Sequence, residues 1–156
     1  MPAASERQDH SERPRTVFRP RRARRVVYFA AALVLVVFVG ANLVLPDEGP
    51  DAWGAGSRAA LGGVALAIAY FLHRLAAVRI VADVTGAEVV NIVGRRRLEW
   101  AEIVGVRMSG GDPWLVMDLS DGQSIAAMGV QRSEGALARR QASEFARLVN
   151  EHTRKP

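Results

Sequence analysis

The histidines and serines of this sequence are the side chains best suited to chemistry, but their spacing does not favour it. His10, His73 and His152 lie far apart, and none has a second histidine at the three- or four-residue spacing of a metal-binding pair. Ser109 and Ser124 lack a plausible histidine partner that would activate a serine nucleophile. No G-x-G-x-x-G or P-loop pattern occurs either. The sequence therefore predicts no metal, no cofactor and no nucleotide site.

Glu99 and Glu102 form a pair of carboxylates three residues apart, which is a spacing that general acid–base chemistry could use. Charged side chains on a strand followed by a turn are far more often solvated surface. We interpret the pair as surface, and we expect that the protein is not an enzyme.

Arg95, Arg96 and Arg97 form the notable basic cluster of the C-terminal half. On a hairpin turn they could bind an anionic lipid headgroup or an acidic protein segment. The favoured alternative is a solvated turn near an anionic membrane surface, where each basic residue gains about 1 kcal/mol. If the domain binds such a ligand, these three arginines are its predicted site.

Trp100 and Trp114 could form an aromatic recognition surface. Trp100 is flanked by Leu98 and Ile103, and Trp114 opens an alternating segment. Large aromatic side chains in such positions usually pack in the core, which is the interpretation we favour.

The elements that position these residues are indicated by an uneven distribution of charge. The 156 residues carry a net charge of +5 and no cysteine, so disulfides and thiolate chemistry are excluded. Residues 1–25 hold eight arginines against three acidic residues, directly beside a long apolar run. Anionic lipid headgroups, rather than nucleic acid, are the natural partner of a basic segment in that position.

The apolar run Val26–Leu45 predicts a membrane-spanning helix. It has 20 residues, contains Asn42 as its only clearly polar side chain, and is ended by Pro46. At about 1.5 Å per residue it spans roughly 30 Å, the thickness of a bilayer core. A cleaved signal peptide is the main alternative, but its apolar region is usually only about 7–15 residues long.

A second, shorter apolar segment predicts a second span. The uncharged stretch Ala59–Leu72 has 14 residues, and a helix extended back to Trp53 brings in Arg58, which can snorkel to the headgroups. Small residues recur at every fourth position, so one face is smooth enough for close helix contact. We expect this face to pack the two helices into a hairpin, with dimerisation as the alternative; it consists of Ala59, Gly63 and Ala67.

Arginines before the first span and an acidic connector between the spans predict the orientation. Asp47, Glu48 and Asp51 lie in the connector, and His73 and Arg74 follow the second span. We expect the protein to lie in the plasma membrane. The positive-inside rule then places both termini in the cytoplasm. We expect residues 1–24 to be a disordered basic tail, residues 25–75 to hold spans at about 26–45 and 53–73, and residues 76–152 to form a domain.

The C-terminal region predicts an antiparallel β-domain closed by a helix, so the fold class is α+β. Asp121-Gly122 is a strong hairpin signal. After Gln131 the period becomes helical, with Ser133 as the expected cap and Glu134 in the first turn. The expected strands are Val78–Ala82, Glu88–Val93, Arg96–Trp100, Ile103–Met108, Trp114–Leu119 and Gln123–Met128; the apolar helix stripe is Leu137, Gln141, Phe145, Leu148 and Val149.

These segments resemble a known family. Arg79–Asp83 with Gly86 and Val89–Asn91 look like the first hairpin of a bacterial pleckstrin-homology-like (PH-like) domain, and Arg96–Val106 is the most specific part. Together they are similar to the actinobacterial low molecular weight protein antigen 6 PH-domain family, which also carries two membrane helices before the domain. The resemblance covers roughly residues 26–150 and implies a seven-stranded barrel with a C-terminal helix, although the position of the seventh strand is not evident. Many relatives are expected to have proline where this chain has Glu99.

The resemblance implies no enzymatic activity. We therefore expect a membrane-anchored PH-like module that binds a protein partner or anionic lipid at the inner leaflet. The alternative is an accessory subunit of a larger membrane or envelope complex, or a homo-oligomer, assembled through its helices. Membrane lipids are expected partners in either case, and nucleic acid is not.

Overall fold

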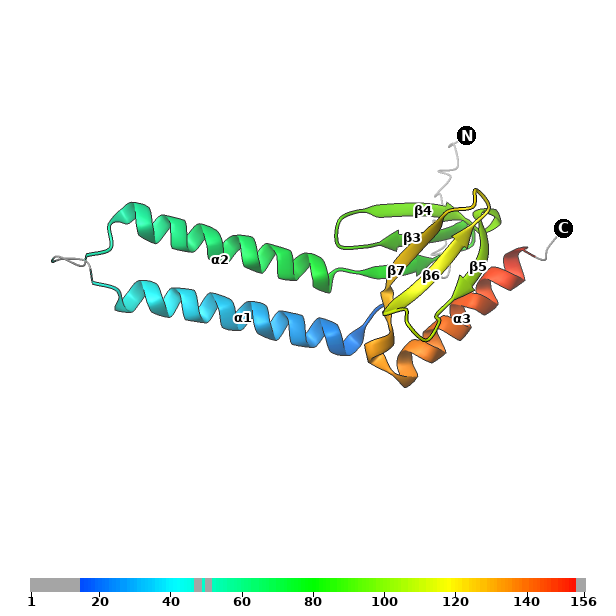
Figure 1. The fold of residues 1–156 in the computed structure, drawn as a ribbon, viewed down its shortest axis with the longest axis horizontal. Coiled ribbons are helices and arrows are strands. Elements are labelled where there is room, and N and C mark those ends of the chain that lie inside the picture. The colour runs from blue at the N-terminus through cyan, green and yellow to red at the C-terminus, as the bar shows by residue number, and fades with distance from the viewer. Residues whose placement is uncertain (1–14, 47–48, 50–51, 154–156) are drawn as a thin grey trace, which may run out of the picture.

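Two long helices extend from one end of a small β-domain in the computed structural model, which describes residues 15–46, 49 and 52–153. Helices α1 (Arg21–Val44) and α2 (Ala55–Ala76) run side by side, and the end of α1 and the start of α2 lie far from the domain (Figure 1). The domain consists of two antiparallel sheets, and helix α3 (Ala136–Thr153) packs against them.

The helical hairpin is inserted between two strands that pair with each other. Strand β1 (Thr16–Phe18) comes before α1, and strand β2 (Arg79–Ala82) comes after α2. They pair antiparallel, with Thr16 opposite Ala82 and Phe18 opposite Ile80. Both ends of the hairpin are therefore fixed in the same sheet.

The remaining strands complete a sandwich that has seven strands within the described residues. Sheet order is β1-β2-β3-β4 in one layer and β5-β6-β7 in the other. Short 3-10 turns, η1 (Trp100–Glu102) and η2 (Arg132–Glu134), follow β4 and β7. The strands not yet given are β3 (Gly86–Val90), β4 (Arg95–Glu99), β5 (Ile103–Arg107), β6 (Trp114–Leu119) and β7 (Ser124–Gln131).

Alternating apolar residues of both sheets and one stripe of α3 form the core. Phe145 of α3 packs edge-on against Phe18 of β1, with ring centroids 5.6 Å apart, and also contacts Trp100. The predicted alternation in β6 is confirmed, because Leu115, Met117 and Leu119 are buried. Trp100 is buried as expected, whereas Trp114 is only half-buried.

The two sheets are joined where β7 crosses β2 and β3. The Asn91 side-chain amide donates to the Ala126 carbonyl oxygen at 2.7 Å and accepts from the Met128 backbone N–H at 3.1 Å. Gly129 lies so close to the Arg79 backbone that a Cβ would approach it to 2.6 Å. Only glycine fits this crossing.

The segment before the first helix differs from the sequence-based expectation. Residues 1–24 were expected to be disordered, but Thr16–Phe18 form the seventh strand and α1 begins at Arg21. Phe18 is 2% exposed, so this strand contributes to the core. Residues 1–14, with His10, lie outside the described residues, as do the connector residues Asp47, Glu48 and Asp51.

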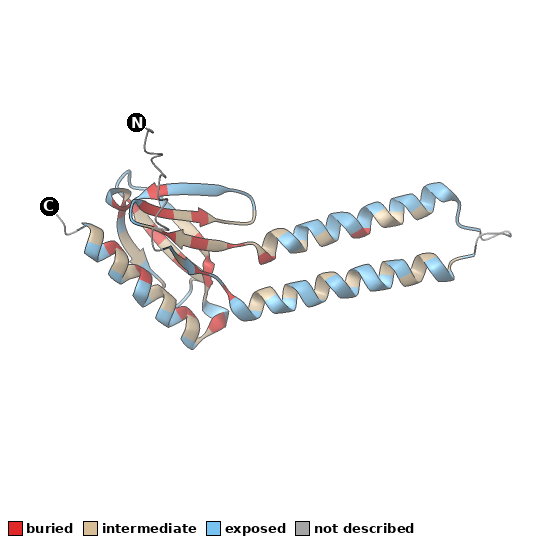
Figure 2. Ribbon diagram, turned by 180° about the vertical axis from the view of Figure 1, so that it is seen from behind, coloured by how far each residue is buried: buried red, intermediate tan, exposed pale blue. Residues whose placement is uncertain are grey.

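The two helices expose most of their apolar surface. Both are long and apolar enough to cross a membrane by length and composition. No residue of α1 is buried, and in α2 only Ala65 and Ala76 are. Figure 2 shows buried residues gathered in the domain while the helices are mainly exposed. The outward apolar side chains include Phe29, Leu33, Val36, Leu43, Leu66 and Phe71.

The face of α2 that packs on α1 is not the predicted one. Ala59, Gly63 and Ala67 are exposed, and a Cβ built at Gly63 would meet nothing within 4 Å. The buried Ala65 and Ala76 lie on a different stripe of the helix. The hairpin interpretation of the Ala59–Gly63–Ala67 face is therefore wrong, and that face stays open.

Candidate anion-binding cleft where the helices join the domain

A buried carboxylate joins the first helix to the domain. Glu134, in the turn η2, is 4% exposed. One of its carboxylate oxygens accepts hydrogen bonds from the backbone N–H groups of Arg22 at 2.8 Å and Ala23 at 2.9 Å. These N–H groups belong to the first turn of α1, where they have no partner within the helix and where the helix dipole favours negative charge.

The role of Glu134 corrects the prediction for the end of the chain. Ser133 and Glu134 were expected to begin the C-terminal helix, but they lie in η2 and α3 begins at Ala136. Glu134 does stabilise a helix N-terminus, as its type suggests, but the helix is α1. Its partners are 111 and 112 residues away in the chain, so no local pattern could reveal them.

A cleft of about 260 Å³ lies at this junction. It is lined by the segment after β1, the first turns of α1, the last turns of α2 and the start of β2. Ala76 and Val78 are buried in its wall. The other lining residues are Arg19, Arg24, Tyr28, His73, Ala77 and Arg79.

Contacts within the cleft hold its polar side chains in place. The Arg24 guanidinium lies over the Tyr28 ring at 5.4 Å from its centroid, which is a cation–π arrangement. The Tyr28 hydroxyl is 3.5 Å from His73 Nδ1, so the helices are linked across the cleft. Arg79 donates one N–H to the Ala77 carbonyl oxygen at 3.1 Å.

The arginines of the cleft lack the acidic partners that other arginines have. Within the described residues, no carboxylate lies within 4.0 Å of the guanidinium groups of Arg19, Arg24 or Arg79. The arginines that form ion pairs with other described residues lie elsewhere in the domain, namely Arg95, Arg96, Arg97, Arg107 and Arg147. No described carboxylate therefore pairs directly with the three arginines that line the cleft.

The predicted ligand residues Arg95, Arg96 and Arg97 do not all lie on one face of the sheet. They lie on strand β4 rather than on a turn, and successive side chains of a strand point to opposite faces. Their nearest carboxylates are those of Glu88, Asp121 and Asp83, at 4.0, 3.8 and 2.7 Å respectively. A ligand site on these arginines stays a prediction.

Asp83 is the most strongly held of these carboxylates. Its burial would raise the pKa, but the hydrogen bonds from Arg97 and Thr85 and the charge of Arg97 outweigh this effect and hold the pKa well below its usual value. The carbonyl oxygen of Asp83 also accepts a hydrogen bond from Trp100 Nε1 at 3.0 Å. Arg97 thus stabilises the β2–β3 turn.

Glu99 and Glu102 also have a structural role. The Glu102 carboxylate accepts from the Glu99 backbone N–H at 2.7 Å, and the two residues form a reciprocal capping box around η1. This explains how glutamate is accommodated where the resemblance implies proline.

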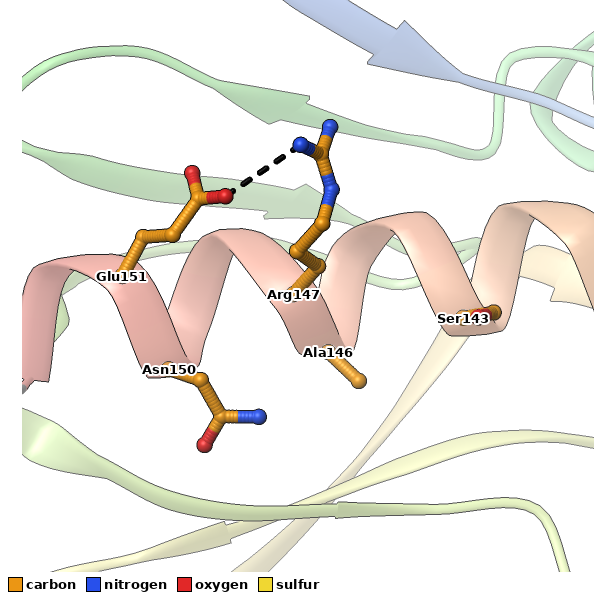
Figure 3. A pocket seen from close by; sticks show the side chains of 5 residues that line it. All are labelled: Ser143, Ala146, Arg147, Asn150 and Glu151. Atoms are coloured by element: carbon orange, nitrogen blue, oxygen red, sulfur yellow. Dashed lines mark hydrogen bonds and ion pairs between the residues drawn. The ribbon is translucent and has the colours of Figure 1, made fainter.

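A second hollow, about 490 Å³ in volume, lies on the outer side of α3 (Figure 3). All five lining residues belong to that one helix, and Arg147 and Glu151, one turn apart on it, form an ion pair at 3.2 Å. The described residues contain no group of three or more His, Cys, Asp or Glu side chains that could hold a metal ion. The cleft at the junction is therefore the stronger candidate site.

In the sequence the cleft residues lie in two distant segments, and no motif marks them as one site. Arg19 and Arg24 precede the first span, and His73 and Arg79 follow the second. They come together because β1 pairs with β2. Strand β1 has only three residues, which is too short a pattern to predict from the sequence.

Comparison with known proteins gives consistent matches. The bacterial PH domain family matches residues 77–148. Over 116 residues the chain is 30% identical to the uncharacterized protein Rv1417 of Mycobacterium tuberculosis and to the uncharacterized protein Mb1452 of Mycobacterium bovis, covering 74% of this chain and 75% of each relative. No solved structure matches significantly.

Proposed function

The chain belongs to the bacterial PH domain family, and on that basis we propose that it is a membrane-anchored, non-enzymatic PH-like protein. The hairpin of α1 and α2 crosses the plasma membrane twice and holds the domain at the cytoplasmic surface. There the domain serves as a binding module for a protein or an anionic lipid at the inner leaflet.

The pairing of β1 with β2 across the helical hairpin is the observation that carries this proposal. Because both strands are in one sheet, the segment before α1 and the domain after α2 must lie on the same side of any membrane. Two crossings satisfy this requirement, and a single crossing does not. Cleavage of the first apolar segment as a signal peptide would remove Phe18 from the core, which argues against that alternative.

The exposed apolar surface of the hairpin supports insertion in lipid. In water, helices that pack only on each other would leave side chains such as Phe29, at 74% exposed, and Leu43, at 81%, in contact with solvent. Large exposed apolar surfaces of this kind are rare on soluble proteins. Arg58, in the first turn of α2, is also compatible with a span, because its guanidinium donates to the Asn42 and Leu45 carbonyl oxygens at the end of α1, which have no partner within that helix.

Membrane fractionation tests the anchoring. The full chain should stay with membranes through washes with high salt and with alkaline carbonate, and neutral detergent should release it. Release by carbonate would contradict the two crossings. Release by salt alone would indicate that only the basic residues bind the membrane surface.

A second function is favoured by one observation, the exposed face of α2 formed by Ala59, Gly63 and Ala67. Small residues allow close helix contact in membranes. On this hypothesis the chain is an accessory subunit of a larger membrane complex, or a homo-oligomer. A monomer after extraction in mild detergent and crosslinking in cells would contradict it.

A further inference from the structure

We propose that the cleft between the hairpin and the domain binds a phosphate-bearing anion, and that its source is the headgroup of an anionic phospholipid of the same membrane. This inference rests on the proposed function and names a ligand class for it. The residues that would contact the ligand are Arg19, Arg24, Tyr28, His73 and Arg79.

The first argument is charge. Three arginines line one small cleft, with no carboxylate among its lining residues. In the same chain, strand β4 carries three consecutive arginines, and each has its own carboxylate partner. Guanidinium groups gathered without acidic partners repel one another, and a bound anion relieves that repulsion.

The second argument is the type of donor. An arginine presents a planar fork of N–H groups that matches the oxygen atoms of a phosphate, and such charge-assisted hydrogen bonds are among the strong ones in proteins. Arg24 is held over the Tyr28 ring, and Arg79 is held by the Ala77 carbonyl oxygen. Both side chains are thus partly ordered before a ligand arrives, which reduces the entropy lost on binding.

The third argument is position. Arg24 and Tyr28 lie at the domain end of α1, on either side of the start of the apolar run at Val26. His73 is in the last turn of α2. If the hairpin spans the membrane, the cleft lies at the depth of the lipid phosphates. Its volume of about 260 Å³ is smaller than that of most pockets for drug-sized ligands, roughly 300–1,000 Å³, and suits a small headgroup.

Ligand-induced stabilisation of the full chain tests this proposal, because a ligand that binds the folded state raises the unfolding temperature. The protein is purified in neutral detergent and mixed with dioctanoyl phosphatidylglycerol, dioctanoyl phosphatidylcholine, glycerol phosphate or inorganic phosphate. The test variant is R24Q/R79Q. The matched control is R139Q/R140Q, which loses the same charge from two exposed positions of α3.

We expect phosphatidylglycerol to stabilise the wild-type chain and R139Q/R140Q, with phosphatidylcholine much less effective. In R24Q/R79Q the affinity should fall about tenfold or more, equivalent to about 1.4 kcal/mol. If that variant does not fold, R19Q replaces it, because Arg19 is exposed and its loss should be tolerated. Equal affinity in the cleft variant and the control would overturn the proposal, and so would equal stabilisation by phosphatidylcholine.

The soluble probes identify the source of the phosphate. Full stabilisation by glycerol phosphate or inorganic phosphate, without a gain from the lipid, would overturn the lipid source and assign the cleft to a soluble phosphate compound. The assay is done in micelles and does not depend on which side of a membrane the domain occupies. A failure of phosphate binding therefore leaves the proposed anchoring intact, and a failure of anchoring in the fractionation experiment would be seen separately.

Discussion

Asp83 accepts four hydrogen bonds in the β2–β3 turn, which makes its charge important for stability. The donors are the Thr85 N–H and hydroxyl, the Gly86 N–H and the Arg97 guanidinium. Burial would raise the pKa of Asp83 from its ordinary value of 3.8, but the hydrogen bonds from Arg97 and Thr85 and the charge of Arg97 outweigh burial and hold the pKa far below that value. A carboxyl group with a lowered pKa in the folded state stabilises the fold above its unfolded pKa. That stabilisation is lost as the pH falls through the folded pKa.

Asp83→Asn should therefore lower the free energy of unfolding at neutral pH by about 1–2 kcal/mol, because the charged hydrogen bond to Arg97 is lost. The difference from wild type should shrink as the pH falls below 3.8, where the wild-type contribution is itself being lost. Thermal unfolding in detergent, followed by tryptophan fluorescence at several pH values, measures both effects. Asp121→Asn is the control, because Asp121 is half exposed and 3.8 Å from Arg96. A difference that grows on acidification would contradict this account.

The sequence predicts only part of the role of Glu134. A glutamate near the start of a helix favours the N-terminus, and the sequence indicates that much. Its hydrogen bonds go to α1, because the core places η2 beside the start of that helix. Likewise, the carboxylates that pair with Arg95–Arg97 are known only once the strand register is known.

At the scale of elements, Glu134 is the joint between the first helix and the domain. Glu134→Ala would leave two backbone N–H groups at the start of α1 without an acceptor, which costs about 1–3 kcal/mol when such groups are buried. The variant should unfold at a lower temperature, and the Arg22 and Ala23 amides should exchange hydrogen faster.

Glu144→Ala is the matched control for this joint, because Glu144 is exposed on the nearby helix α3. It should change neither the unfolding temperature nor the exchange rates appreciably. Similar behaviour of the two variants would mean that Glu134 does not fasten α1 to the domain.

Elements with a clear local period could be predicted, and those defined by distant partners could not. Strand β6 has strict alternation and formed as expected. Helix α3 has a helical apolar stripe and also formed, although it begins at Ala136 rather than directly after Ser133. The three residues of β1 have too short a pattern, and their partner strand is separated from them by both long helices. The packing face of α2 was misassigned because small residues lie on more than one side of that helix, and only the position of α1 selects between them.

At the scale of the whole molecule, the way the hairpin joins the domain determines which side chains line the cleft. The hairpin enters and leaves the domain between two paired strands, so arginines from before α1 and after α2 meet at one junction. In a spanning hairpin this junction faces the headgroups, and the paired arginines of β4 lie on the domain itself. The pairing of β1 with β2 therefore both fixes the hairpin to the domain and brings the residues of the candidate site together.

Thiol labelling tests the central claim, that the N-terminal segment and the domain lie together on the cytoplasmic side of a twice-crossed membrane. The chain has no cysteine, so single cysteines can be placed at the exposed positions Arg15, Gly54 and Ser120. We predict that a membrane-impermeant maleimide labels Gly54→Cys in intact spheroplasts, and labels Arg15→Cys and Ser120→Cys only after lysis. Labelling of Ser120→Cys in intact spheroplasts, or of Arg15→Cys and Ser120→Cys from opposite sides, would contradict the account.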